Sequence, residues 1–338
     1  MIPPKNRIAI LVPWFLLILW AGTCGPTGCS PHGGPPEKIT IGTNLNAMVG
    51  LLFIAKTQGY DQAHNLEIIL KSYQTGLEPV RELKAGRLDL ASCAEFALVQ
   101  EIFAGGAGLR CLATISSGEV DELIARRDRG VNRPEDLKGK TIGVPRKTSA
   151  EFFLGRFLTF NHISLGEVSV VDVNPFDLAD TLAAGKIDAV LIWEPITHDI
   201  KKKLGNNAVA WPAQEGQKVY RLLLSREEVV KKKTAALEKL MRALAQAAEF
   251  AREQPAEARA IVSQWLKVPV SDLQAPKKYD LFLEQVLLLA MEDQARWMIE
   301  NKLTDQTRVP NYLEYIDAEV LLKVTPQAVR IIIPKDKM

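Results

Sequence analysis

The sequence LKAGRLDLA at Leu83–Ala91 returns later in the chain as LAAGKIDAV at Leu182–Val190. Both stretches read Leu-x-Ala-Gly, then a basic residue, an aliphatic residue, Asp, any residue and an aliphatic residue. Upstream of them, Thr-Ile-Gly at 40–42 matches Thr-Ile-Gly at 141–143. The paired glycines are 44 residues apart in the first set and 42 apart in the second. These matches predict an internal repeat of two similar units.

Each unit has the same predicted order of elements. A short aliphatic strand opens the unit, a polar loop and an amphipathic helix follow, and a second strand, a short helix and a third strand complete it. Such units build parallel sheets with right-handed crossovers. The predicted strands are 38–42, 66–72 and 88–92 in the first unit and 141–144, 168–173 and 187–192 in the second, and the predicted helices are 48–58, 78–85, 150–161 and 175–184.

The repeat predicts an α/β fold with two lobes and a cleft between them, followed by a helical C-terminal region. Ligands of open α/β sheets bind outside the carboxyl ends of the strands, which here would face the cleft. Strand-like runs at 122–126 and 219–224 are predicted to cross between the lobes, so that lobe two is inserted into lobe one. The predicted boundaries are 38–122 with 225–338 for lobe one and 123–224 for lobe two.

The C-terminal part reads as almost wholly helical from 226 to 301, starting at a cap formed by Ser225 and Glu228. Its apolar positions, such as Leu237 and Leu244, are expected to pack onto lobe one. The aliphatic run 329–333 is predicted to be a late strand or a surface strap.

Residues 1–29 predict a lipoprotein-type signal segment. A small basic region precedes the apolar run 8–20, which is too short to span a bilayer and suits a secretory signal. Cys29 is the predicted lipidation site and Cys24 the alternative; a plain secretory signal or an uncleaved anchor is the other interpretation. Residues 30–37 read as a linker. We therefore expect a lipid-anchored protein on the periplasmic or extracellular face of the cytoplasmic membrane.

The composition is that of a soluble protein long enough for two globular units, with 338 residues, 47% of them hydrophobic and 24% charged. The net charge of +2 gives no basic field for nucleic acid, so none is expected as a partner. The four histidines are scattered, and no catalytic or nucleotide-binding motif is found, so neither catalytic residues, a metal nor a cofactor is predicted. Cys93 and Cys111 could pair in an oxidising compartment or remain as buried thiols.

The candidate ligand-binding residues lie in loops that follow the predicted strands. Several are at apparent helix N-termini, where free backbone N–H groups favour anions, although the same side chains can simply cap the helices. Trp193 is expected at the cleft rim, with a place in the core as the alternative, and Glu194 either binds a ligand amine or pairs across the hinge. The set is Asn44, Asn46, Met48, Ser92, Cys93, Glu95, Ser116, Thr148, Ser149, Trp193 and Glu194.

The expected solute has a polar or anionic head and an apolar or aromatic body. No arginine lies in the candidate loops, so we expect a monoanion or a neutral heterocycle rather than a compact dianion. Asp89 and Asp188 follow the glycine turns and are predicted to fix those turns.

The run DLKGKTIGVP at 136–145, Thr148-Ser149, the stretch AGKIDA at 184–189 and Trp193-Glu194-Pro195 together resemble the nitrate/sulfonate/taurine class of solute-binding proteins. That class also takes in binders of thiamine-precursor pyrimidines, and the resemblance covers residues 38–224. It implies a type II periplasmic-binding-protein-like α/β fold. It also implies a non-enzymatic protein that closes on a small solute and delivers it to an ABC permease and ATPase.

Two alternatives stay open at this point. A few relatives are enzymes that make a pyrimidine from a histidine and a pyridoxal cofactor, but their cysteine-rich motif is not found in this sequence. The same scaffold can also serve a sensor that presents its solute to a membrane kinase, because fold does not decide function.

Overall fold

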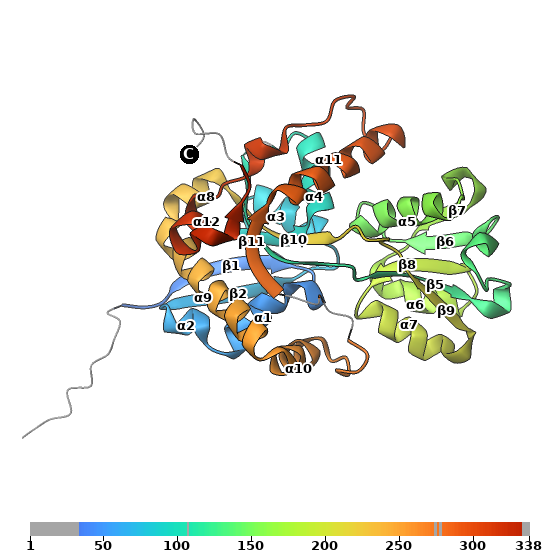
Figure 1. Cartoon of the computed structure of the whole chain (residues 1–338), viewed down its shortest axis with the longest axis horizontal. Helices are drawn as coiled ribbons and strands as arrows, with labels where there is room; N and C mark the ends of the chain where they lie inside the picture. The colour runs from blue at the N-terminus through green and yellow to red at the C-terminus, as the bar shows by residue number, and fades with distance from the viewer. Residues whose placement is uncertain (1–33, 107, 274–275, 277–278, 333–338) are drawn as a thin grey trace, which may run out of the picture. The chain divides into compact units, whose positions relative to one another are not determined.

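Two β-sheets organise the part of the chain that the computed structural model describes, residues 34–106, 108–273, 276 and 279–332 (Figure 1). The seven-stranded sheet has the order β12-β11-β4-β10-β3-β1-β2, and the five-stranded sheet has the order β7-β6-β8-β5-β9. The predicted signal segment, Cys24, Cys29 and most of the linker lie outside the described residues. Among the described residues no helix is both long and apolar enough to cross a membrane.

The seven-stranded sheet is mixed, because β10 runs antiparallel between β3 and β4. Its strands are β1 (Glu37–Thr43), β2 (Leu66–Ser72), β3 (Leu90–Ala94), β4 (Leu109–Gly118), β10 (Val219–Arg226), β11 (Tyr279–Glu284) and β12 (Val329–Arg330). The helices of this part are α1 (Gly50–Thr57), α2 (Tyr60–Ala63), α3 (Leu77–Lys84), α4 (Glu95–Phe103), α8 (Glu227–Lys232), α9 (Thr234–Glu253), α10 (Pro255–Leu266), α11 (Gln285–Glu300) and α12 (Glu319–Val324).

The five-stranded sheet is also mixed, because β5 runs antiparallel to both of its neighbours. Its strands are β5 (Asp121–Arg126), β6 (Thr141–Val144), β7 (Ser169–Asp172), β8 (Ala189–Trp193) and β9 (Ala208–Pro212), and its helices are α5 (Ser149–Phe160), α6 (Leu178–Ala183) and α7 (Ile196–Leu204).

The aspartates of the repeat hold equivalent turns in the two sheets, as predicted. The backbone N–H of Thr40 donates to Asp89 Oδ2 and that of Thr141 donates to Asp188 Oδ2, each at 2.9 Å. The preceding glycines, Gly86 and Gly185, have φ of +79° and +71°, a region that residues with a Cβ rarely adopt. In each unit the glycine therefore ends the short helix, and the aspartate links the following turn to the first strand of the sheet.

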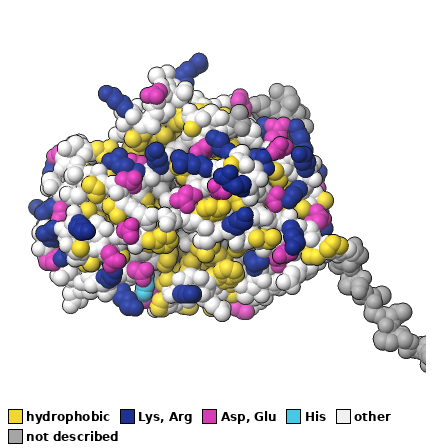
Figure 2. All heavy atoms as spheres, turned by 180° about the vertical axis from the view of Figure 1, so that it is seen from behind, with side chains coloured by type: hydrophobic (Ala, Val, Ile, Leu, Met, Phe, Trp, Pro, Cys, Tyr) yellow, Lys and Arg dark blue, Asp and Glu magenta, His cyan; other side chains and the backbone are white. Residues whose placement is uncertain are grey.

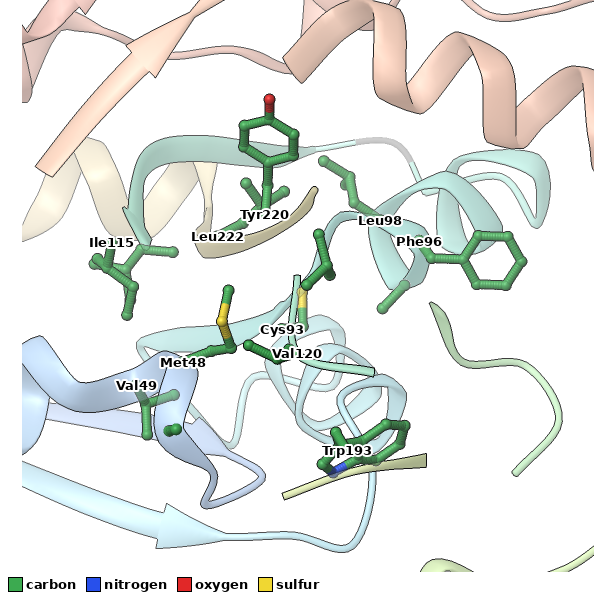
Figure 3. Packing of buried hydrophobic residues seen from close by; sticks show 14 of the residues in the cluster. Met48, Val49, Cys93, Phe96, Leu98, Ile115, Val120, Trp193, Tyr220 and Leu222 are labelled. Carbon is green, nitrogen blue, oxygen red and sulfur yellow. The ribbon is translucent and has the colours of Figure 1, made fainter. Parts of the chain in front are cut away.

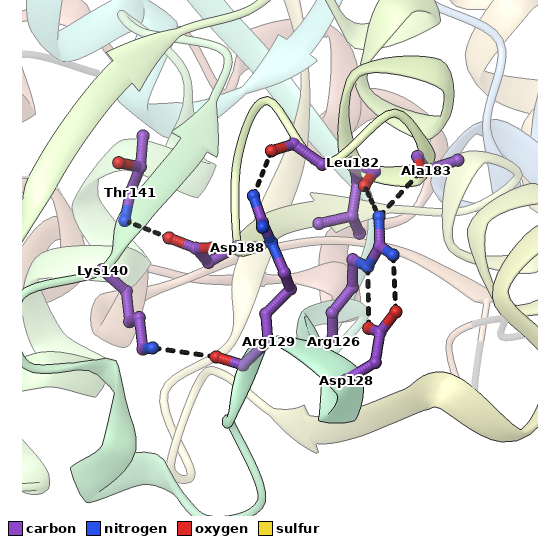
Figure 4. Close-up of polar contacts among 9 residues, drawn as sticks. Arg126, Asp128, Arg129, Lys140, Thr141, Leu182, Ala183 and Asp188 are labelled. Carbon is purple, nitrogen blue, oxygen red and sulfur yellow. Dashed lines mark hydrogen bonds and ion pairs between the residues drawn. The ribbon is translucent and has the colours of Figure 1, made fainter.

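Basic side chains stabilise the turn of the second unit (Figure 4). The Arg126 guanidinium donates to the carbonyl oxygens of Leu182 at 2.8 Å and Ala183 at 2.7 Å, and Arg129 donates to the carbonyl of Gly185. The carbonyl of Leu182 also accepts from the N–H of Gly185 at 3.0 Å, and the two arginines add charged donors to the carbonyls at the end of α6, which lack the usual helical partners.

The chain passes twice between the sheets, at residues 119–120 and at 213–218. The side-chain amide of Gln214 joins the two passages: its oxygen accepts from the N–H groups of Val120 and Asp121, and its nitrogen donates to the carbonyl of Gly118. The predicted strands at 122–126 and 219–224 are present as β5 and β10, but each lies within one sheet. The lobe boundaries themselves stay a prediction.

Two expectations for the C-terminal part are wrong. Ser225 does not cap α8, because it is still part of β10 and its hydroxyl donates to the carbonyl of Asp89. The region up to residue 301 is not wholly helical, since β11 pairs with β4 within it. The apolar face of α9, by contrast, packs against α1 as expected, and Leu237 and Leu244 are fully buried.

Charged side chains of both signs are interspersed over the face shown in Figure 2. This face therefore has no continuous field of one sign.

Candidate ligand-binding site

Loops and strand ends from both sheets line one pocket, which encloses about 450 Å³ of space outside the protein atoms, part of it open to solvent. The polar lining residues are Asn44, Asn46, Asp121, Lys147, Thr148, Ser149 and Arg221, and the other lining residues are Met48, Gly76, Leu77, Ala94, Ala97, Val120, Trp193 and Val219. Six of the predicted ligand-binding residues are among them: Asn44, Asn46, Met48, Thr148, Ser149 and Trp193. Their contact with a ligand stays a prediction.

On the side of the seven-stranded sheet, the loop after β1 supplies two asparagines. Asn46 caps the short 3-10 helix that precedes α1, because its Oδ1 accepts from the N–H of Met48 at 3.0 Å. Asn44 Oδ1 accepts from Arg221 Nη1 at 2.9 Å. Capping therefore accounts for Asn46, whereas Asn44 orients the guanidinium of Arg221.

On the other side, Thr148 and Ser149 begin α5. Thr148 is the N-cap residue, but its hydroxyl donates to the carbonyl of Pro145 at 2.7 Å and makes no capping hydrogen bond. The first N–H groups of a helix have no partner within the helix and carry partial positive charge. The start of α5 therefore gives this wall of the pocket a dipole that favours negative charge.

Trp193 is the last residue of β8 and is only 8% exposed. It lines the pocket and also belongs to the hydrophobic core, where Figure 3 shows it with Met48 and Val120. The two interpretations of Trp193, cleft rim and core, are thus not exclusive.

Two buried charged residues of the pocket, Asp121 and Arg221, were not predicted from the sequence. Each is 4% exposed, and among the described residues Arg221 Nε and Asp121 Oδ2 have no hydrogen-bond partner. Burial raises the pKa of Asp121 to about 7 and lowers that of Arg221 to about 10, so Arg221 keeps its charge at neutral pH. An arginine within the apolar run VYRLLL was the available signal.

Arg221 changes the basis of the expectation for the solute, which was drawn from candidate loops without arginine. The candidate loops indeed lack arginine, but β10 brings a guanidinium to the pocket from a distant part of the sequence. A buried guanidinium is costly unless an anion or several acceptors surround it. The pocket is therefore better suited to an acidic group than the loops alone indicated.

Five predicted residues lie outside the pocket lining: Ser92, Cys93, Glu95, Ser116 and Glu194. Ser92 and Cys93 are fully buried in β3, and Ser116 donates from its hydroxyl to the carbonyl of Met48 at 2.6 Å. Glu194 borders a different surface pocket beside His198. Cys93 and Cys111 are both free thiols, and burial raises the pKa of Cys93 to about 12.

Glu95 lies buried behind the pocket. Its carboxylate accepts from the N–H of Tyr220 at 2.8 Å and from Gln294 Nε2 at 2.7 Å, which ties α4 to β10 and α11. Burial raises the pKa of Glu95 to about 7. Its place in the structure is that of a link between elements.

Known proteins are similar to this chain in sequence and in fold. The family model described as "NMT1/THI5 like" matches residues 46–258, more than half of the chain. A protein of Brucella abortus (strain 2308), named only as a binding protein, is 28% identical over 244 residues, which cover 70% of this chain and 72% of the relative.

Two solved structures illustrate the range of functions on this fold. The alkanesulfonate-binding protein SsuA from Xanthomonas axonopodis pv. citri bound to MOPS has a TM-score of 0.71 and 19% identity, covering 84% of this chain and 99% of SsuA. The desulfurization enzyme DSZB has a TM-score of 0.61 and 15% identity, covering 86% of this chain and 99% of the enzyme. At these identities the likeness shows the fold alone, and it confirms the periplasmic-binding-protein fold. Because its family model matches more than half of the chain, the chain belongs to the NMT1/THI5-like family.

Proposed function

We propose that this protein is the solute-binding subunit of an ABC importer and that it captures a small organic acid in the pocket between its two sheets. The observation that carries the proposal is Arg221, a buried guanidinium that lines the pocket with its Nε unpaired among the described residues. An acidic group beside the start of α5 would meet both the guanidinium and the helix dipole. The binding of an alkanesulfonate by SsuA agrees with this choice of ligand.

Capture would proceed by hinge closure. Direct contacts already join the elements on either side of the pocket: Gln100 Nε2 donates to the carbonyl of Lys147 at 2.8 Å, and Arg156 pairs with Asp293 at 3.3 Å. Opening would break these contacts, whereas the passages joined by Gln214 would bend. A ligand that touches both sides stabilises the closed state by its differential affinity for that state.

Binding is favoured here over catalysis. The free thiol nearest to the site in sequence, Cys93, lies outside the pocket lining, and its raised pKa keeps it protonated and poorly nucleophilic. An enzyme shares the fold, so the choice rests on the pocket residues and not on the architecture. Delivery to a permease and ATPase and lipid anchoring at Cys29 on the outer face of the membrane belong to the same proposal; mass spectrometry of the native protein would test the anchor.

The test is calorimetric titration of the folded protein with propane-1-sulfonate, butanoate, nitrate and a neutral aminopyrimidine. We expect an organic acid to bind and Arg221→Gln to weaken that binding by about 1.5–3 kcal/mol, the scale of a buried charge-assisted hydrogen bond. Arg221→Lys, which keeps the charge, should recover part of the affinity.

Arg110→Gln is the matched control. Arg110 lies in the neighbouring strand β4, is ion-paired with Glu227 at 2.6 Å and does not line the pocket, so its loss should leave the affinity unchanged. Binding of the pyrimidine alone, or equal affinity of a folded Arg221→Gln variant, would refute the proposal.

A further inference from the structure

Helix α11, which belongs to the seven-stranded part, packs against helix α5, which belongs to the five-stranded part (Figure 1). Trp297 of α11 meets Phe152 of α5 edge to face, with ring centroids 5.5 Å apart and ring planes at 87°. Phe96 of α4 lies 6.2 Å from Trp297 and 6.0 Å from Phe152. Both phenylalanines are 1% exposed. The three rings therefore join the two parts of the chain through a mostly buried aromatic contact.

A glycine in the middle of α5 makes room for this tryptophan. A Cβ on Gly155 would lie 2.6 Å from Trp297 Nε1 and 2.8 Å from Trp297 Cζ2. Glycine is less favourable than alanine inside a helix, and Gly155 does not have the positive φ that would require glycine. The close approach of α11 therefore explains this glycine, whereas the helix α5 by itself does not need it.

An ion pair borders the aromatic contact. Arg156 Nη1 of α5 lies 3.3 Å from Asp293 Oδ2 of α11. The guanidinium carbon of Arg156 also lies 5.0 Å from the ring centroid of Phe160 and 5.9 Å from that of Phe152. These rings hold the guanidinium on α5 where it can meet α11. We call this set of contacts the α11 clasp, made by Phe152, Gly155, Arg156, Asp293 and Trp297.

The α11 clasp lies next to the pocket, and none of its five residues lines it. Helix α5 begins at the pocket with Ser149, and Phe152 and Gly155 follow within two turns. On the other side, Ala97 of α4 lines the pocket, and its neighbour Phe96 contacts the rings of the clasp. Moving α5 away from α11 would expose these rings to water, which is unfavourable. The clasp therefore favours the arrangement in which the start of α5 stays at the pocket, with or without a ligand.

We propose that the α11 clasp holds the two sheets in the closed arrangement before a ligand binds, with Trp297 as a positioning residue for the start of α5. The effect on affinity rests on the proposed capture of a solute by closure, whereas the effect on the shape of the ligand-free protein does not. A ligand binds only the molecules that are in the competent arrangement, so its apparent affinity falls in proportion when that fraction falls. Loss of the clasp should therefore weaken binding through residues outside the pocket lining.

Small-angle X-ray scattering of the ligand-free protein tests the clasp. Trp297→Ala removes the aromatic contact and should increase the radius of gyration, because more molecules open. Saturation with propane-1-sulfonate or butanoate, whichever the wild type binds more tightly, should then reduce the radius of gyration of the variant more than that of the wild type. Calorimetry with the same acid should show binding weakened about tenfold by Trp297→Ala.

Gly155→Ala separates the clasp from the stability of the fold. Alanine raises the intrinsic helix propensity of α5, yet its Cβ would displace Trp297. The variant should therefore stay folded and still have a larger radius of gyration without ligand. In the double variant Gly155→Ala/Trp297→Ala the collision is relieved, so alanine at position 155 should add nothing to the effect of Trp297→Ala.

Trp265→Ala is the matched control. Trp265 of α10 stacks on Phe53 of α1 with ring centroids 4.7 Å apart, so this contact lies within the seven-stranded part and outside the pocket lining. Its loss should leave both the radius of gyration and the affinity unchanged, whatever it does to stability.

The outcomes separate the two proposals. A folded Trp297→Ala variant with the radius of gyration and affinity of the wild type would overturn the clasp. Tighter binding by that variant would also overturn it, since the contact would then favour the open arrangement, and so would an equal effect of Trp265→Ala. Failure of both acids to bind the wild type would count against the proposed function, and the scattering of the ligand-free proteins would still decide the clasp.

Discussion

The two units of the repeat agree in the residues that shape the backbone and differ in those that face the pocket. Asp89 and Asp188 make the same hydrogen bond, and their turns begin at glycines of similar φ. The first loops differ, since one supplies Asn44 and Asn46 and the other supplies Thr148 and Ser149. The comparison teaches that the scaffold and the recognition surface of this protein are carried by separate residues, so each should be changeable without the other.

The largest effect, on the free energy of unfolding, is expected at two equivalent glycines of the scaffold, Gly42 and Gly143. A Cβ on Gly42 would lie 2.4 Å from Leu88 Cδ1, and one on Gly143 would lie 2.6 Å from Ile187 Cδ1. Because these neighbours are buried, Gly42→Val and Gly143→Val should each lower the free energy of unfolding by about 3 kcal/mol, as overpacked cores do. Urea unfolding would measure it.

Gly166→Ala serves as the control, because nothing lies within 4 Å of a Cβ at Gly166. If valine lowers the free energy of unfolding in one unit and not in the other, the result would contradict the structural equivalence of the two units.

A smaller effect, on ligand affinity, is expected at Trp193, the aromatic residue that the second unit contributes to the pocket. Trp193→Ala should weaken binding of an organic acid by about 1–3 kcal/mol, since an aromatic face is lost from the pocket. As Trp193 also packs in the core, the melting temperature should fall as well. Calorimetry on the folded variant separates the two effects, and an unchanged affinity would assign Trp193 to the core alone.

The scaffold aspartates should behave in the opposite way. Asp89→Ala and Asp188→Ala each remove the acceptor of a Thr N–H and should cost about 1–2 kcal/mol of stability, the scale of a buried unsatisfied donor. Ligand affinity should not change, because neither residue lines the pocket. A folded variant with normal stability but weakened binding would contradict the separation of scaffold from recognition.

The smallest effect is the pH dependence of stability that comes from the region between the units. Asp121 and Glu95 have pKa values raised to about 7 by burial, above their values of 3.8 and 4.5 outside the fold. Both bind protons more tightly in the folded state, so their contribution to stability is full below pH 4 and is lost as the pH rises through 7.

Differential scanning fluorimetry of the ligand-free protein should therefore show a contribution from these groups that lowers the melting temperature by a few degrees between pH 5 and pH 8. Glu95→Gln should flatten the profile relative to the wild type. A profile identical to that of the wild type would contradict the raised pKa of Glu95.

Local patterns in the sequence were enough to predict most of the repeat. The bounds of β2 and β6 agree with the predicted strands, and the roles of Asp89 and Asp188 followed from their place after a glycine turn. These features depend on residues close together in the chain or on a match between two stretches.

The pocket could be predicted only in part, because its charged residues are far apart in the sequence and come together only in the folded chain. Arg221 donates a hydrogen bond to Asn44, which lies 177 residues earlier in the sequence, and no local pattern predicts that contact. Glu95 follows a strand as predicted, yet Gln294 of α11 covers it. A loop position predicts nearness to the cleft, whereas exposure to the cleft depends on what packs over the loop.

The most direct test of the account is hydrogen–deuterium exchange of the wild-type protein with and without the tightest-binding acid of the calorimetric panel. If the two units close on one ligand, backbone amides at residues 44–50 and at 147–152 should both gain protection at saturation, while those of the solvent-facing helix α10 should not change. Protection of only one of these loops, with saturation verified by calorimetry, would show that the ligand binds to a single unit and would contradict capture between the two sheets.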